Sequence, residues 1–309
     1  MYESFFGLRE RPFQLTPNPR FLFLSPAHRE ALATLCCGLG ASAGVTVLLG
    51  EAGTGKTTLV RAALKAEQWP NNRHLMLSNP TLTRAEFYEM LTAGFDVVSS
   101  SGSKARFLIE FERDALDRQR QGGVNTLIID DAQSLTAELF EEVRFLADLE
   151  TETAKLLNVI LVGTQELGTR LEEPQLKQLR QRVALRSTLT PMDLQETADY
   201  IAARLSVAGV DASDIFTKDA VLAVFEASHG IPRTIGVICD NALLGGFAAQ
   251  IKPIDRPIVV DVCRDFAFPL NGLTPQERVA VLELPDVEDG VDVFGAVART
   301  APNGTTLVN

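Results

Sequence analysis

The sequence predicts an α/β fold, in which a parallel five-stranded sheet with helices on both faces is followed by a small all-helical domain. Three observations support this prediction. Short apolar segments alternate with helical patterns as far as residue 190, as they do in parallel sheets covered on both faces. The segment 124–131 is apolar on both faces, which is typical of a buried parallel strand. Beyond Pro191, as far as about residue 267, only helical periodicity remains.

Each expected strand is a short run of β-branched and aliphatic residues. The five runs are 45–50, 74–78, 124–131, 159–163 and 183–189. Helices are expected between them, and one is long and amphipathic, follows the serine-rich connector 99–103 and ends at Gly122-Gly123. In the second domain the pattern predicts four helices, at 194–207, 218–227, 232–249 and 257–266.

A glycine-rich segment follows the first strand and leads at once into a helical pattern. It reads G-x-x-x-x-G-K-T, which is the Walker A form of a phosphate-binding loop. Glycines let the backbone turn tightly and aim N–H groups at an anion, and the helix start adds its positive dipole end. The complete motif disfavours the alternative, a glycine turn before an ordinary helix. The predicted nucleotide-binding residues are Gly50, Glu51, Ala52, Gly53, Thr54, Gly55, Lys56, Thr57 and Thr58.

Two side chains of this loop and one downstream acid carry the expected ligand chemistry. Lys56 supplies a positive charge for the β- and γ-phosphates, and the Thr57 hydroxyl can coordinate Mg²⁺. Asp130 ends the third expected strand, at the Walker B position, where a carboxylate can hold the Mg²⁺ that bridges the phosphates. The alternative for Asp130 is an acid that only ends a strand. The expected cofactors are therefore ATP and Mg²⁺.

Asp131 is a second carboxylate beside the expected metal ligand. An acid at this position can orient and polarise the water that attacks the γ-phosphate. Its alternative role is to bond the local loop or to cap the helix that begins near Leu135.

The composition of the chain indicates which partners and which cellular compartment to expect. The chain has 309 residues, enough for two domains, and a formal net charge of −11, which does not support binding to nucleic acid or to an acidic membrane surface. Its four cysteines form no C-x-x-C pair and are expected as free thiols in a reducing cytoplasm. Charged residues interrupt the N-terminus, and no apolar run reaches about 18 residues. We therefore expect a cytoplasmic protein without direct membrane insertion.

The chain resembles the ExeA-like (general secretion pathway protein A) family of AAA+ ATPases over residues 1 to about 267. The similar segments are 1–8, 12–13, 16–23, 50–58, 127–133, 162–167, 179–183 and 230–233. The resemblance implies the P-loop NTPase (AAA+) fold with a helical lid domain, ATP hydrolysis, homo-oligomers and an as yet unidentified protein partner in bacterial secretion. It extends to TnsC-like transposition regulators, in which ATP-bound subunits assemble on DNA.

The resemblance also implies roles for three further residues. Thr164, just past the fourth strand, resembles sensor 1, a polar group that reads the γ-phosphate or the attacking water; the alternative is a strand-end hydroxyl. Arg182 resembles an arginine finger that acts on a neighbouring subunit's nucleotide, although Arg180 and Arg186 lie nearby and a solvated arginine is the alternative. Arg233, which follows Gly-Ile-Pro, resembles sensor 2 of the lid.

The sequence departs from the family pattern in two places. Asp131 stands where the family usually has glutamate, and the side chain is shorter by about 1.5 Å. Because misplacing a catalytic group by about 1 Å can cost about 100-fold in rate, we expect slow turnover. The family's secretion members also carry a membrane segment and a periplasmic cell-wall-binding part after the ATPase, and we expect neither in this chain.

Together these observations predict four parts. They are an aromatic N-terminal arm at 1–27 that packs on the core beside the nucleotide, the AAA+ αβ domain at 28–190, the helical lid at 191–267, and an acidic, partly disordered tail at 268–309. The predicted function is an ATPase that couples nucleotide state to a partner. The alternative is an ATP-gated DNA-binding adaptor, for which Lys104, Arg106, Arg113 and Arg118 are candidate contacts. A small-molecule P-loop kinase is a weaker third hypothesis, since no acceptor-binding motif is present.

Overall fold

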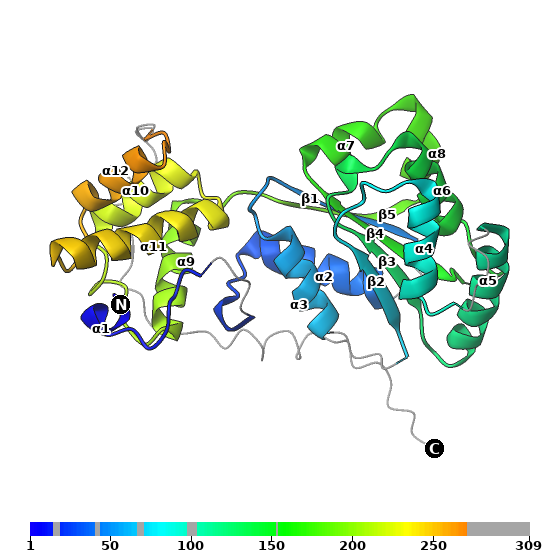
Figure 1. Cartoon of the computed structure of the whole chain (residues 1–309), viewed down its shortest axis with the longest axis horizontal. Coiled ribbons are helices and arrows are strands. Elements are labelled where there is room, and N and C mark those ends of the chain that lie inside the picture. The colour runs from blue at the N-terminus through cyan, green and yellow to red at the C-terminus, as the bar shows by residue number, and fades with distance from the viewer. Residues whose placement is uncertain (15–18, 41–43, 67–70, 98–103, 153, 271–309) are drawn as a thin grey trace, which may run out of the picture. The chain divides into compact units, whose positions relative to one another are not determined.

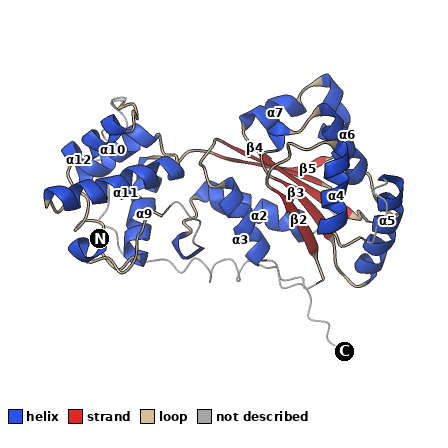
Figure 2. Cartoon of the chain, in the orientation of Figure 1, coloured by secondary structure: helices blue, strands red, loops and turns tan. Residues whose placement is uncertain are grey.

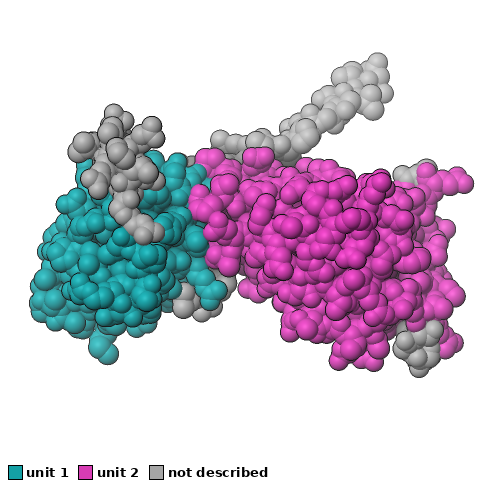
Figure 3. Space-filling model, turned by 90° about the horizontal axis from the view of Figure 1, so that it is seen from above, with its two compact units in different colours: residues 1–25, 192–309 teal, residues 26–191 magenta. Residues whose placement is uncertain are grey.

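The computed structural model describes residues 1–14, 19–40, 44–66, 71–97, 104–152 and 154–270 (Figure 1). The chain divides into two compact units, coloured separately in Figure 3. The αβ unit spans Pro26–Pro191, and the helical unit combines Met1–Ser25 with the chain from Met192 onward. The expected connector at 99–103 and residues 271–309 of the expected tail lie outside the described residues.

The αβ unit is built on one sheet whose five strands are all parallel, in the order β2-β3-β4-β1-β5. The strands are β1 Val45–Gly50, β2 Arg73–Leu77, β3 Asn125–Ile129, β4 Leu157–Gly163 and β5 Val183–Leu189. The fold prediction is therefore confirmed. Strand ends differ by up to two residues from those expected: β3 stops at Ile129, and β4 already begins at Leu157.

Helices cover both faces of this sheet (Figures 1 and 2). The helices α2 and α3 pack on one face, and α4, α6 and α7 pack on the other, with α5 against α4. Their bounds are α2 Pro26–Gly40, α3 Lys56–Ala66, α4 Arg84–Gly94, α5 Lys104–Arg120, α6 Ala137–Ala147, α7 Gln165–Leu171 and α8 Lys177–Arg180, with short 3₁₀ turns η2 Ala132–Ser134 and η3 Pro174–Leu176.

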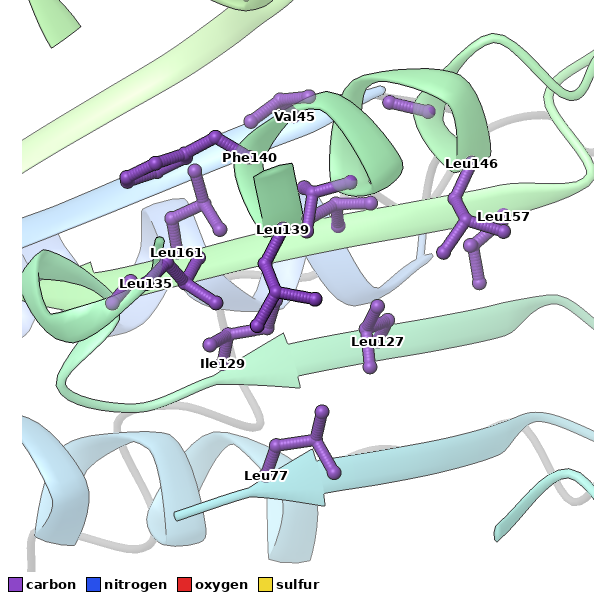
Figure 4. Close-up of a cluster of buried hydrophobic side chains, with 14 of the residues drawn as sticks. Val45, Leu77, Leu127, Ile129, Leu135, Leu139, Phe140, Leu146, Leu157 and Leu161 are labelled. Carbon is purple, nitrogen blue, oxygen red and sulfur yellow. The ribbon is translucent and has the colours of Figure 1, made fainter. Parts of the chain in front are cut away.

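The face of the sheet beneath α6 carries the largest apolar cluster of the αβ unit (Figure 4). Leu127 and Ile129 of β3 and Leu161 of β4 point into it, together with Leu139 of α6. Each of these side chains is fully buried, and burying a leucine side chain stabilises the fold by about 1.5–3 kcal/mol. The alternation of these residues along the strands fixes the register, and with it the edge at which each strand ends.

The helical unit contains the four helices that the sequence predicts, each within one residue of its expected bounds. They are α9 Leu194–Val207, α10 Lys218–Ser228, α11 Pro232–Ala249 and α12 Arg256–Asp265. Asp193 caps α9 through a capping box with Glu196, and Thr217 and Asp255 cap α10 and α12 with their side chains. None of the described helices is long and apolar enough to span a membrane.

The N-terminal arm packs in the helical unit, and the expectation that it packs on the nucleotide-binding core is wrong. It contains α1 Glu3–Phe6 and the 3₁₀ turn η1 Pro19–Phe21. Phe6 and Phe13 are buried in the same cluster as Leu205 and Leu243 of the helical unit. The arm's apolar residues have no helical or strand period that would name their partner, so aromatic content predicts an ordered segment but not where it packs.

Candidate nucleotide-binding site

Most of the predicted site residues lie at the carboxyl ends of three neighbouring strands. β1 ends at Gly50, β3 is followed by Asp130, and β4 is followed by Thr164. Since β3, β4 and β1 are adjacent and parallel, these three ends lie side by side. Ligands of open parallel sheets bind in the crevice beyond the carboxyl ends of the strands.

The loop from Gly50 to Gly55 has the tight backbone that the glycines predict. Gly53 and Gly55 have φ angles of 87° and 94°, a region that side-chain-bearing residues rarely adopt. A Cβ at Gly50 would lie 2.8 Å from Thr54 Oγ1. The Thr54 hydroxyl donates a hydrogen bond to the carbonyl of Glu51 at 2.9 Å, which closes the loop on itself.

His28 of α2 supports this loop and was not found from the sequence. Its buried ring places Nε2 2.9 Å from the carbonyl oxygen of Thr54. A carbonyl only accepts, so Nε2 carries the proton in this contact. Nothing in the sequence around His28 marks it, because the contact joins residues 26 positions apart.

Lys56 begins α3 and is only 7% exposed. Its ammonium donates hydrogen bonds to the carbonyls of Gly50 at 3.0 Å and Glu51 at 2.9 Å. Burial lowers the pKa of Lys56, and the nearby charges of Asp130 and Asp131 oppose this effect only in part. A buried ammonium at a helix start, directly after a glycine-rich loop, can bind a polyanion.

Thr57 and Asp130 meet at the same edge. The Thr57 hydroxyl donates to Asp130 Oδ2 at 2.6 Å, and Asp130 is 5% exposed with its N–H bonded to the carbonyl of Leu77. Magnesium holds neighbouring oxygen ligands about 3 Å apart, given its Mg–O distance of about 2.1 Å. The oxygen atoms of Thr57 and Asp130 therefore have the type and the spacing of two adjacent ligands in the coordination sphere of a magnesium ion.

Asp131 lies beside Asp130 and is exposed, with a left-handed backbone at φ 52°. Gln133 of η2 donates from Nε2 to Asp131 Oδ1 at 3.2 Å and accepts at Oε1 from the N–H of Thr164, also at 3.2 Å. Thr164 is the N-cap residue of α7, but its hydroxyl makes no capping hydrogen bond. The structure thus brings Asp131 and Thr164 together through Gln133, which the sequence reasoning did not assign.

Comparison with known proteins agrees with this geometry. Residues 40–171 match the family model described as an AAA domain. General secretion pathway protein A of Aeromonas hydrophila is 39% identical to the chain over 250 residues, which are 80% of this chain and 45% of that protein. The chain thus spans less than half the length of this relative.

Residues 40–171 of the chain thus form an AAA domain. Among solved structures, Cdc6p of Pyrobaculum aerophilum matches 92% of the chain and 74% of its own at a TM-score of 0.62 and 16% identity. The ORC2 protein of Aeropyrum pernix, solved as ADPNP and ADP complexes, matches 88% and 74% at 0.60 and 15%. The RuvB motor of Thermotoga maritima matches 89% and 78% at 0.55 and 16%. These likenesses concern the fold.

Arg182 lies at the amino end of β5, whereas the loop lies at the carboxyl ends of the strands. It precedes β5, and Leu189, the β5 partner of Gly50, lies seven residues further along, about 20 Å at strand spacing. Its Nε lies 2.9 Å from Asp148 Oδ1 in a half-exposed ion pair. Arg182 therefore cannot reach the loop of its own subunit.

The two competing arginines have other surroundings. Arg180 forms an ion pair with Glu172, and Arg186 is exposed within β5. Arg233 belongs to the helical unit, where it is exposed in the first turn of α11. Its predicted contact with nucleotide stays a prediction.

The basic residues that the adaptor hypothesis singled out on α5 are largely engaged within the chain. Lys104 pairs with Glu142, Arg113 with Glu110, and Arg118 with Asp114. An ion-paired helix face offers little net positive potential to a phosphate backbone.

Proposed function

We propose that this AAA+ protein binds ATP with Mg²⁺, hydrolyses it slowly, forms homo-oligomers and couples its nucleotide state to a protein partner. The observation that carries the proposal is the convergence of Lys56, Thr57 and Asp130 at one sheet edge. Lys56 and the loop amides hold the β- and γ-phosphates. Thr57 and Asp130 hold the metal ion, which when bound neutralises phosphate charge.

Asp131 orients the attacking water in this proposal. The water oxygen bonds to the γ-phosphorus as the bond to the β-phosphate oxygen breaks, and ADP and inorganic phosphate leave. Asp131 is the only exposed carboxylate directly beside Asp130 in the described chain. Its side chain is one methylene shorter than a glutamate, so the water is held less well and turnover is slow.

A neighbouring subunit completes the site by contributing Arg182. Arg182 is far from the loop of its own subunit and half-exposed, which is compatible with a role in another copy. A guanidinium stabilises the charge that spreads over the γ-phosphoryl oxygens in the transition state. On this proposal hydrolysis depends on assembly.

The first experiment measures release of inorganic phosphate from ATP by the purified protein, with Mg²⁺ and after its removal by EDTA. We expect slow turnover that rises with protein concentration, disappears with EDTA, and increases in Asp131→Glu. Tight ATP binding without turnover at any protein concentration would rule out the enzyme.

A mixing experiment tests the shared site. Arg182→Ala alone should lose about 100-fold or more of the turnover, while its subunits still bind ATP. Mixing it with Lys56→Ala subunits should restore turnover, because the latter keep Arg182 and can supply it to a neighbour's ATP. Arg180→Ala, which removes an arginine paired with Glu172, is the control. A mixture no more active than the sum of its parts would contradict the shared site.

The partner we propose belongs to protein secretion or envelope export, since the 39% identical relative is named General secretion pathway protein A. That relative is longer, so its pathway is carried over as a proposal only. We propose a cytoplasmic location, where ATP is abundant. No disulfide joins any of the four cysteines within the described residues, which fits a reducing compartment.

The second candidate, an ATP-gated DNA adaptor with slow or no hydrolysis, is favoured by one observation, the short Asp131. The ion pairs of α5 and the net charge of −11 count against it. Binding of labelled duplex DNA that needs ATP and weakens steeply with salt would favour the adaptor. No binding at low salt would exclude it.

A further inference from the structure

The side chain of Gln133 lies between the two residues assigned to the attacking water. Its Oε1 accepts from the Thr164 N–H, and its Nε2 donates to the Asp131 carboxylate, both at 3.2 Å. Gln133 thus links the Asp131 carboxylate to the residue that follows β4.

The chemistry of the two partners fixes the orientation of the amide. A backbone N–H only donates and an ionised carboxylate only accepts, so exchanging Oε1 and Nε2 would make both contacts repulsive. Asparagine is too short by one methylene to span both groups, and glutamate would repel Asp131. Of these three side chains, only glutamine can bond to both the Thr164 N–H and the Asp131 carboxylate.

The surrounding structure holds the amide in place. Gly163 leaves room for it, because a Cβ there would lie 2.6 Å from Gln133 Oε1. Arg170 donates to the backbone carbonyl of Gln133 and, at 2.7 Å, to that of Leu135, which fixes the 3₁₀ turn. The Arg170 guanidinium in turn stacks over the Phe140 ring at 4.8 Å.

Asp131 needs such support. It is exposed, its backbone is left-handed, and its own N–H is bonded to Asp130 Oδ1 at 3.1 Å, which anchors the main chain but not the carboxylate. An exposed, short side chain rotates freely unless a neighbour holds it.

We propose that Gln133 is a positioning residue, which holds the Asp131 carboxylate at a fixed spacing from Thr164 so that one water can contact both. This inference rests on the proposed ATP hydrolysis. Gln133 touches neither the loop nor the metal-binding pair in the described contacts, so it acts on the rate of the chemical step and not on ATP affinity.

The test compares kcat and KM for ATP in full-length wild type, Gln133→Met and Gln133→Glu. Methionine keeps the length and removes both hydrogen bonds, while glutamate keeps the bond to Thr164 and repels Asp131. Both variants should lose about 10- to 100-fold in kcat with KM changed by less than about twofold. Gln175→Met, at an exposed glutamine of η3, is the control and should keep wild-type kinetics.

A double-mutant cycle separates positioning from bracing of the fold. In an Asp131→Asn background, Gln133→Met should cost almost nothing further, because the carboxylate that it positions is gone. Additive losses, a Gln133→Glu variant that keeps full activity, or an unchanged kcat in Gln133→Met would each overturn the inference. Absence of turnover in wild type would instead overturn the proposed ATPase, so the two failures are distinguishable.

Discussion

Each of the two units contains a helix whose first turn carries a basic residue that the sequence assigns to nucleotide, but the two helix starts differ. α3 starts with Lys56 after a glycine loop, and the lysine is 7% exposed and bonded to two loop carbonyls. α11 starts at Pro232, with Arg233 exposed in its first turn.

The difference lies in what the backbone can contribute. The glycine loop before α3 has positive φ angles at Gly53 and Gly55, and such a loop leading into a helix start can form an anion cradle. Proline at the start of α11 has no N–H and fixes φ, which suits a helix start but removes one donor. At α3 a glycine loop can act together with the side chain, whereas α11 starts with one backbone donor fewer and has an exposed guanidinium.

The largest expected effect concerns Lys56. Lys56→Ala should weaken ATP binding by about 100-fold or more, because it removes the one buried cation of the cradle. Isothermal titration calorimetry with ATP and Mg²⁺ measures this. Lys65→Ala, an exposed lysine in the last turn of the same helix, should bind like wild type. Tight binding by Lys56→Ala would remove the contrast between the two helix starts.

A smaller effect is expected at Arg233. Arg233→Ala should reduce turnover by about tenfold without changing the melting temperature, since a charge-assisted hydrogen bond to an exposed side chain contributes about 1.5 kcal/mol. Turnover assays and differential scanning calorimetry measure the two quantities. Arg264→Ala, another exposed arginine of the helical unit, is the matched control. Equal turnover in both variants would leave α11 without a nucleotide role.

The smallest expected effect concerns the free energy of unfolding and compares one buried carboxylate in each unit. Glu142 of α6 is buried and contacts Lys104, Arg84 and Tyr88. Burial raises the pKa of Glu142, but hydrogen bonds from Lys104 and Tyr88 and the two positive charges outweigh burial and lower it. A lowered pKa in the folded state stabilises the fold above the unfolded pKa of about 4.3, and this contribution is lost as the pH falls.

Glu142→Gln should therefore cost about 1 kcal/mol near neutral pH and make unfolding less steeply dependent on pH below about 4.5. Urea titrations between pH 3 and 7 measure the free energy of unfolding. Glu226→Gln, which removes the buried carboxylate paired with Arg256 in the helical unit, provides the comparison. A pH profile of Glu142→Gln parallel to that of wild type would contradict the assignment.

Most of the fold could be predicted from local patterns in the sequence. Buried parallel strands are apolar on both faces and short, and the residues of β1 and β5 needed no partner to be identified. The four helices of the second unit followed from apolar spacing and from stop signals such as Pro191. The packing of the arm could not be predicted, because its buried phenylalanines pack against α9 and later helices, which lie far away in the sequence.

The site residues also form two groups, those that a local motif predicts and those that only the tertiary structure reveals. Lys56, Thr57 and Asp130 belong to motifs whose spacing is fixed by strand, loop and helix, and the structure brings them within contact. His28, Gln133 and the partner of Arg182, Asp148, depend on tertiary contacts that leave no periodic signal. Thr164, Arg182 and Arg233 came from resemblance, and their roles stay predictions.

The placement of the arm has a consequence for synthesis. Residues such as Tyr2, Phe6 and Phe13 leave the ribosome before the αβ unit, yet their cluster is completed by Val259 and Cys263. The αβ unit is translated in full between these two points and has its own core. The nascent chain must therefore carry an unburied aromatic segment while about 240 further residues are made, at about 5–20 residues per second, for some tens of seconds. The arm is the segment most exposed to chaperones and proteases before the helical unit closes on it.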